Sequence, residues 1–132
     1  MPADALAWLP AVSIDLAVWE GARPDSEKDA LEMYESLYDL YIDTEEPTTP
    51  SPAIAAYVAA LLERYTDLTE LDDDSVDDSP WSDGPLIENA SGPFFYFGFV
   101  RNAALDEAWG YAVDTARSMG LVAFDPQSER LA

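Results

Sequence analysis

Nearly every residue is apolar in the most hydrophobic stretch of the chain, residues 93–100, and in a β-strand these side chains would alternate between two faces. One side of the extended backbone carries three aromatic rings, those of Phe95, Phe97 and Phe99. The other side carries Phe94, Tyr96, Gly98 and Val100. Because both sides are largely apolar, the pattern predicts a central strand that is covered on both faces, or covered on one face and flanked by large neighbours on the other.

A second strand is predicted directly before this one, over residues 85–89 (Pro-Leu-Ile-Glu-Asn). Residues 89–92 (Asn-Ala-Ser-Gly) supply the residue types that favour a tight turn between the two. Pro93 enters the following strand at its start, where a missing N–H group is tolerated. The stretch is therefore predicted to be a β-hairpin.

Two shorter patterns predict two more strands. In residues 13–20 one face of the strand carries Ile14, Leu16 and Val18. The opposite face carries Asp15, Ala17 and Trp19. Residues 121–125 form the last short strand, which Pro126 ends. The tail from there to Ala132 is predicted to be exposed.

The first of three predicted helices is capped by Ser26 and runs to about Ile42, with acidic residues in its first turn, where the helix dipole favours negative charge. Its apolar stripe consists of Leu31, Tyr34, Leu37, Tyr38 and Tyr41. Buried tyrosines usually keep their polar tips near water, so this stripe is predicted to be core with its hydroxyl groups at the rim. A ligand cage is the alternative.

The second helix is predicted to be capped by Ser51 and to have Pro52 at its first position. Its buried face consists of Ile54, Tyr57, Val58, Leu61, Leu62 and Tyr65. The third helix is predicted to begin with Asn102 as its cap and to end before Gly120, a residue type favoured just past a helix C-terminus.

The resulting order, β-α-α-β-β-α-β, predicts a single α+β domain over residues 13–132. It resembles a ferredoxin-like sandwich with one extra helix in the first crossover. We expect a mainly antiparallel four-stranded sheet with its helices on one face, and a flexible N-terminal extension over residues 1–12. The uncovered face would expose Trp19 and other aromatic rings, which predicts a partner or a homodimer there. Alternatively, the acidic loop, the N-terminal segment or the tail folds over that face.

Charge narrows the class of partner. The 132 residues include 6 Lys and Arg against 27 Asp and Glu, a formal net charge of −21. Nucleic acid and anionic membranes both require a basic surface, so neither is predicted as a partner. The charge favours a basic partner or a cation, with simple solubility in an acidic proteome as the alternative.

The chain contains no cysteine and no histidine. This removes disulfides, thiolate chemistry, His-dependent triads and the commonest general base and metal ligand. There is no G-x-S-x-G elbow and no phosphate-binding glycine loop, so we predict no catalytic residue and no cofactor. No apolar run approaches the roughly 20 residues of a membrane span, and residues 1–12 lack the basic start of a signal peptide. A cytoplasmic location is therefore predicted.

Residues 67–78, hereafter the acidic segment, are the most acidic part of the chain. They lack the spaced oxygens, central glycine and closing glutamate of an EF-hand loop, so no specific metal site is predicted. We predict instead a surface that meets a basic protein, with Trp81 as an aromatic anchor inside a charged rim. The alternative is a structural Trp81 that fastens the segment to the core. The predicted partner-binding residues are Asp72, Asp73, Asp74, Asp77, Asp78, Trp81, Asp83, Glu45 and Glu46.

Three stretches of the chain also carry a resemblance: SIDLAVWEG (13–21), SPWSDGPLIENASGPFFYFGFV (79–100) and GLVAFDPQSERL (120–131). Together they resemble a group of small, acidic, mostly uncharacterised actinobacterial proteins, and more loosely the immunity proteins that accompany polymorphic toxins. The shared motifs are structural rather than catalytic. The resemblance implies an immunity-type role, in which an acidic protein occludes the active site of a toxin.

Three functional hypotheses follow. The first is a cytoplasmic protein-binding module without enzymatic activity, of the immunity or antitoxin type, whose acidic surface blocks a basic toxin domain. The second is a small-ligand-binding protein or enzyme that uses carboxylates and tyrosines in an aromatic pocket, with Asp15, Glu20 or Glu88 in that pocket. The third is a homodimer that pairs aromatic sheet faces.

Overall fold

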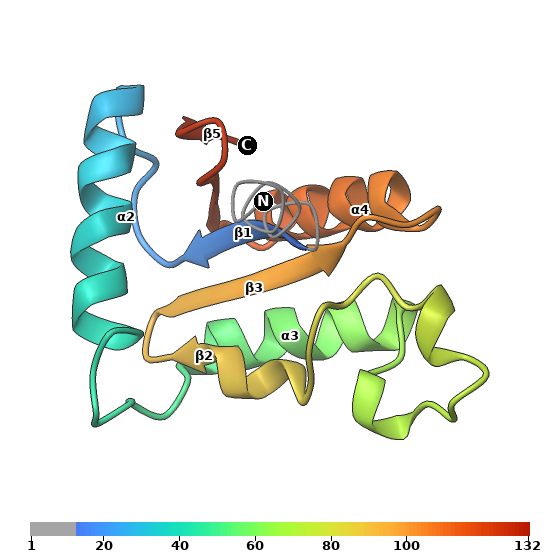
Figure 1. The fold of residues 1–132 in the computed structure, drawn as a ribbon. Coiled ribbons are helices and arrows are strands. Elements are labelled where there is room, and N and C mark those ends of the chain that lie inside the picture. Colours follow the sequence, from blue (N-terminus) through green and yellow to red (C-terminus); the bar gives the residue numbers. More distant parts are fainter. Residues whose placement is uncertain (1–12) are drawn as a thin grey trace, which may run out of the picture.

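The computed structural model describes residues 13–132, so the predicted flexible extension over residues 1–12 lies outside the described part. A five-stranded antiparallel sheet has the order β2-β3-β1-β4-β5 (Figure 1). Its strands are β1 (Ser13–Trp19), β2 (Ala90–Ser91), β3 (Phe94–Val100), β4 (Val122–Asp125) and β5 (Arg130–Leu131). Three α-helices accompany it in the described part: α2 (Glu27–Tyr41), α3 (Pro52–Arg64) and α4 (Leu105–Ser118). The predicted α+β class is confirmed.

The centre of the sheet is the pair formed by β1 and β3. The two strands pair over their full length, from Ser13 opposite Val100 to Trp19 opposite Phe94. β4 pairs with the other edge of β1, where Ala17 lies opposite Phe124. β3 is thus central, as predicted, and β1 is central beside it. The side chains of both strands divide into two sets because alternate residues point to opposite faces.

Helices cover both faces of the sheet. One face carries Leu16, Val18, Phe95, Phe97 and Phe99, which pack with α3 and α4 in one buried cluster. The other face carries Ala17, Trp19, Phe94 and Phe124, which pack against α2 in a second cluster. The prediction that all helices cover one face is therefore wrong. α2 covers the aromatic face together with Leu131 from the tail, so of the predicted alternatives the tail contributes and the acidic loop does not.

Local signals in the sequence set most helix ends correctly. The Ser26 hydroxyl accepts a hydrogen bond from Asp29 N, and the Ser51 hydroxyl accepts one from Ile54 N, so both serines cap their helices as predicted. Gly120 follows α4 with φ +74°, and its neighbour Leu121 donates its N–H to Ala116 O. The positive φ is a conformation that glycine adopts without a Cβ clash.

The predicted position of the third helix cap, Asn102, is wrong. α4 begins at Leu105 with Ala104 as its N-cap residue, which makes no side-chain cap. Asn102 Oδ1 instead accepts from Ala104 N in a turn before the helix, at 2.9 Å. The amide of Asn102 donates to Ser79 O at 2.8 Å, so this side chain ties the start of α4 to the end of the acidic segment.

The predicted strand over residues 85–89 is also wrong. Leu86–Asn89 forms a short 3₁₀ helix, η4, and β2 is limited to the next two residues. The N–H of Leu86 is bonded to a carboxylate oxygen of Asp67, and the N–H of Glu88 to Pro85 O, so neither donor pairs with β3. Along the remaining edge of β3, Ser82 N donates to Gly98 O and Val100 N donates to Pro80 O.

The C-terminal tail is exposed at residues 127–130, as predicted, but it also forms a short strand that was not predicted. After a turn in which Glu129 has φ 59°, β5 pairs with β4, and Leu131 N donates to a carboxylate oxygen of Glu27 in α2 at 2.7 Å. The predicted four-stranded sheet therefore has a fifth strand. β5 lies beside α2 and helps to close the second face of the sheet (Figure 1).

Two further predictions are affected by this architecture. Trp19, Phe94 and Phe124 are almost completely buried under α2, so the described part has no exposed aromatic sheet face to support the predicted homodimer. No helix in residues 13–132 has the length and apolar character needed to cross a bilayer.

Candidate functional site

The acidic segment projects from one end of α3 as two short 3₁₀ turns, η2 (Leu68–Glu70) and η3 (Val76–Asp78) (Figure 1). Asp72 folds back within it, because its carboxylate accepts the N–H of Ser75 at 3.0 Å. The segment exposes all five carboxylates that the sequence assigned to partner binding there: Asp72, Asp73, Asp74, Asp77 and Asp78. All five are thus accessible to a partner on this segment.

A buried carboxylate holds the segment to the rest of the domain. Asp67 is only 5% exposed. Its Oδ1 accepts from Thr69 N and Thr69 Oγ1, both at 3.0 Å, and its Oδ2 accepts from Leu86 N at 2.9 Å. Gly84 passes so close that a Cβ there would lie 2.7 Å from Asp67 Oδ1. Asp67 therefore fixes the start of the acidic segment against η4.

The ionisation of Asp67 reflects two opposing effects. Desolvation by burial raises its pKa, but the hydrogen bonds from Leu86 and Thr69 favour the charged form and together outweigh burial. The net result is a pKa below the usual value of 3.8. The structural role of Asp67 was not predicted from the sequence. The Asp-Leu-Thr spacing is typical of an aspartate that closes a local turn, whereas its bond to Leu86 had no local signal.

Trp81 does not lie at the surface. It is 1% exposed, its Nε1 donates to Tyr65 O at 3.0 Å, and its ring contacts Phe97 and Phe99. The assignment of Trp81 as the anchor of a partner interface is therefore wrong, and the structural alternative describes it. The indole fastens the end of the acidic segment to the core.

The other predicted partner-binding residues lie apart from the five aspartates. Glu45 and Glu46 are exposed in the loop before α3, while the acidic segment follows α3 (Figure 1). A helix of 13 residues spans about 20 Å at 1.5 Å per residue. That distance is about two Debye lengths at physiological ionic strength, so the two regions are electrostatically separate. Asp83 is exposed beside η4 and accepts a hydrogen bond from Asn89 Nδ2.

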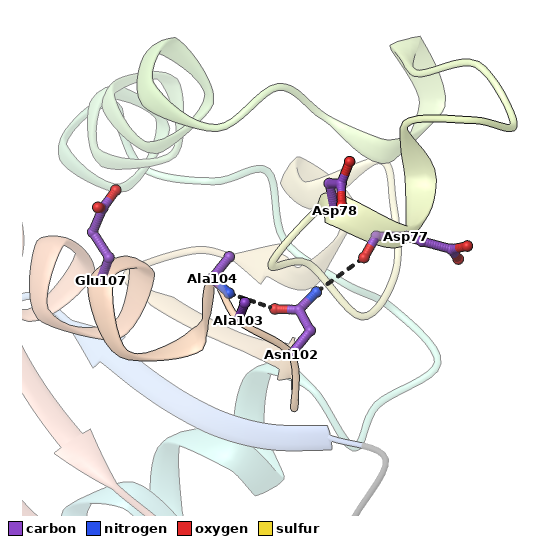
Figure 2. A pocket seen from close by; sticks show the side chains of 6 residues that line it. All are labelled: Asp77, Asp78, Asn102, Ala103, Ala104 and Glu107. Carbon is purple, nitrogen blue, oxygen red and sulfur yellow. Dashed lines mark hydrogen bonds between the residues drawn. The ribbon is translucent and has the colours of Figure 1, made fainter.

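A cavity of about 420 Å³ lies between the acidic segment and the start of α4 (Figure 2). Its lining consists of Asp77, Asp78, Asn102, Ala103, Ala104 and Glu107. Within this lining, Asn102 Nδ2 donates a hydrogen bond to Asp77 O at 3.2 Å. The carboxylates of Asp77, Asp78 and Glu107 point in different directions rather than toward one centre (Figure 2). Accordingly, no group of acidic side chains within residues 13–132 has the arrangement of a metal site.

Basic side chains do little to neutralise this surface. Within the described residues the one ion pair joins Arg64 Nη2 to Glu107 Oε1 at 2.6 Å, and both side chains are more than half exposed. Tyr65 donates its hydroxyl to the same Glu107 oxygen, and burial together with this bond raises the pKa of Tyr65 to about 12. The aspartates of the acidic segment form no ion pair with any described residue.

The pocket expected for the second functional hypothesis is largely filled. The space between sheet and helices holds closely packed rings, and each buried side-chain nitrogen or oxygen in the described part has a hydrogen-bond partner. Glu88 lines a surface cavity of about 240 Å³ that also includes Tyr41 and Tyr96. Asp15 is half-buried and accepts a bond from Tyr96, and Glu20 is exposed.

Comparison of this chain with family models, with curated proteins and with solved structures found no match.

Proposed function

We propose that the protein is a cytoplasmic binding module of the immunity or antitoxin type, which neutralises a toxin by covering its basic active site with an acidic surface. The mechanism is steric and electrostatic, and it requires no catalytic group or cofactor from this chain. The partner is a basic protein domain, and neither nucleic acid nor a membrane is involved.

The observation that supports this proposal is the presentation of the five exposed aspartates of the acidic segment. Their backbone is anchored at one end by buried Asp67 and at the other by buried Trp81. A surface that is fixed before binding loses less conformational entropy on association than a free loop. Arg64 lies near Asp78 but is paired with Glu107, so the five aspartates stay unpaired within the described part. A negative patch of this kind attracts a basic partner and speeds their encounter.

The test begins with affinity capture from the native host, using the tagged protein at low and at moderate salt. The captured basic protein is then expressed alone and together with this chain. We expect growth inhibition by the partner alone and restored growth on co-expression. Association in vitro should weaken and slow as salt is added, because exposed charge pairs are screened over about 8–10 Å at physiological ionic strength.

A triple variant, Asp72→Asn, Asp73→Asn and Asp74→Asn, tests the surface directly. We expect it to bind at least about tenfold more weakly, with most of the change in the association rate. The matched control removes three exposed carboxylates on α2 and beside its two ends: Asp25→Asn, Glu32→Gln and Asp43→Asn. Equal effects of the two triple variants, or binding that does not depend on salt, would exclude the acidic segment as the binding surface.

One observation favours the alternative of a small-ligand-binding protein, namely the cavity that Glu88 shares with Tyr41 and Tyr96. At about 240 Å³ it is slightly smaller than the roughly 300–1,000 Å³ of common ligand pockets. Native mass spectrometry of the protein purified from its host would detect a retained ligand. A ligand lost in the variant Glu88→Gln would favour this alternative over the protein-binding role.

A further inference from the structure

A second acidic feature lies on α2, away from the acidic segment, and it combines carboxylates with aromatic rings. Tyr34 and Tyr38 are four residues apart, as are Glu35 and Asp39, so the two pairs form adjacent rows on the helix surface. Together they line a hollow of about 320 Å³. The two carboxylate side chains are exposed, and the two rings are half-buried.

The rings of the hollow are held in place from below. Tyr34 stacks on Phe124, with ring centroids 5.1 Å apart and planes at 28°. Tyr38 meets Tyr96 edge to face, at 5.2 Å and 89°. Tyr96 itself is fixed, because its hydroxyl donates to Asp15 Oδ2 at 2.7 Å. The aromatic surfaces are therefore positioned without any ligand.

The charge of the hollow is not neutralised by this chain. None of the described basic side chains forms an ion pair with Glu35 or Asp39. Tyr34 stays uncharged at neutral pH, since burial raises its pKa. Two carboxylates beside two ring faces thus give a negative, partly apolar surface.

We infer that this hollow binds a guanidinium group, which lies against the rings of Tyr34 and Tyr38 and donates hydrogen bonds to Glu35 and Asp39. A guanidinium is planar, is weakly hydrated for a cation, stacks on aromatic faces and donates to carboxylates in a fork geometry. An ammonium lacks the planar face and the fork. In the proposed function, on which this assignment rests, the group is an arginine side chain of the basic partner. A free small guanidinium compound is the other source of the same chemistry.

The experiment is a heteronuclear NMR titration of the full chain with ethylguanidinium, using ethylammonium and neutral ethylurea as matched probes. We expect the side-chain resonances of Tyr34 and Tyr38 to shift with ethylguanidinium, less with ethylammonium and not with ethylurea. The blocked tripeptide acetyl-Gly-Arg-Gly-amide tests the source, since tighter binding than ethylguanidinium indicates a protein-borne arginine. Equal binding of the two indicates a free small cation.

Variants test the carboxylates and the aromatic rings of the hollow separately. Glu35→Gln with Asp39→Asn should weaken ethylguanidinium binding about tenfold, whereas Glu32→Gln, on the same helix but outside the hollow, should change it less than twofold. Tyr38→Leu should weaken binding, and Tyr38→Phe, which keeps the ring face, should preserve it.

Equal shifts with ethylurea, shifts confined to residues 72–78, or equal effects of the hollow variants and Glu32→Gln would overturn the assignment. The proposed function is tested by different experiments from those that test the guanidinium assignment. It depends on growth rescue and on the Asp72, Asp73 and Asp74 variants, which leave the four residues of the hollow unchanged.

Discussion

The two faces of the sheet are covered in different ways. On one face, two helices, α3 and α4, bury Phe95, Phe97 and Phe99 almost completely. On the other, α2 and the short β5 cover Trp19, Phe94 and Phe124, while the tyrosines around them remain half-exposed. A single helix is too narrow to cover a five-stranded face. The rim is therefore filled by side chains with an apolar ring and a polar tip, and such a rim can bind a ligand while a filled core cannot.

The largest expected difference between the faces comes from ring deletion. Phe97→Ala should lower the free energy of unfolding by about 4 kcal/mol, because it leaves a cavity in a fully packed core. Tyr38→Ala on the other face should cost about half as much, since its ring is partly exposed and water can enter the gap. Urea denaturation of both variants measures the difference. Equal losses would mean that the two faces are equally well packed.

The next largest effect is expected at Asp67, the buried residue that holds the acidic segment to the domain. Asp67→Asn should lower the free energy of unfolding by about 2–3 kcal/mol at pH 7, because an amide replaces a buried carboxylate that accepts three hydrogen bonds. Asp73→Asn, at an exposed position in the same segment, should change it by less than about 0.5 kcal/mol. Similar losses in both variants would contradict the anchoring role of Asp67.

The Asp67 effect should depend on pH. Its pKa is lower in the folded protein than the usual 3.8, so its stabilisation is fully present above pH 3.8. The stabilisation is lost as the pH falls through the folded pKa, where the carboxylate takes up a proton. The difference in stability between the wild type and Asp67→Asn should therefore shrink in acid, as urea titrations from pH 6 down to pH 2 would show. A difference that grows in acid would contradict the sign of the shift.

A smaller contrast compares one tyrosine hydroxyl from each face. Tyr57 donates to Ala112 O at 2.7 Å in the core, and Tyr57→Phe should cost about 1–1.5 kcal/mol. Tyr96 donates to Asp15 over the same distance at the rim, where water can replace it, so Tyr96→Phe should cost less than about 1 kcal/mol. Thermal unfolding of both variants tests the order, and a larger loss for Tyr96→Phe would reverse it.

The smallest effect is expected on the outer surface of the α3–α4 layer. The Arg64–Glu107 pair is 51% and 64% exposed at its two side chains, and exposed pairs contribute about 0–1 kcal/mol. Glu107→Gln should therefore change the free energy of unfolding by less than about 1 kcal/mol, with the difference vanishing in high salt. A larger effect that persists in 1 M salt would show that the pair contributes substantially to stability.

Residues that act on their near neighbours could be predicted from the sequence. Ser26 and Ser51 cap helices through N–H groups three residues away, and Gly120 adopts a positive φ within the turn it ends. The exposed aspartates of residues 72–78 follow from the same logic, because a run of like charges stays in solvent. The apolar residues on both sides of β3 likewise predicted a central strand, with cover on both faces as one of two alternatives.

Residues whose partners lie far along the chain could not be predicted from the sequence. Residues 85–89 have the sequence pattern of a strand, but in the structure the N–H of Leu86 donates to the carboxylate of Asp67 instead of to a neighbouring strand. Trp81 looks like a surface anchor until Tyr65, Phe97 and Phe99 surround it. The hollow on α2 exists only because Phe124 and Tyr96, from two strands, support its rings.

The sequence by itself determined the α+β class, the three helices of the described part, the strand β1 and the central strand β3, because each depends on a local period or cap. Only the tertiary structure decided that α2 crosses to the opposite face, that residues 130–131 add a fifth strand and that Trp81 is buried. The physical reason is that an apolar stripe specifies that a helix must be covered, but not by which surface. That choice depends on contacts between segments tens of residues apart.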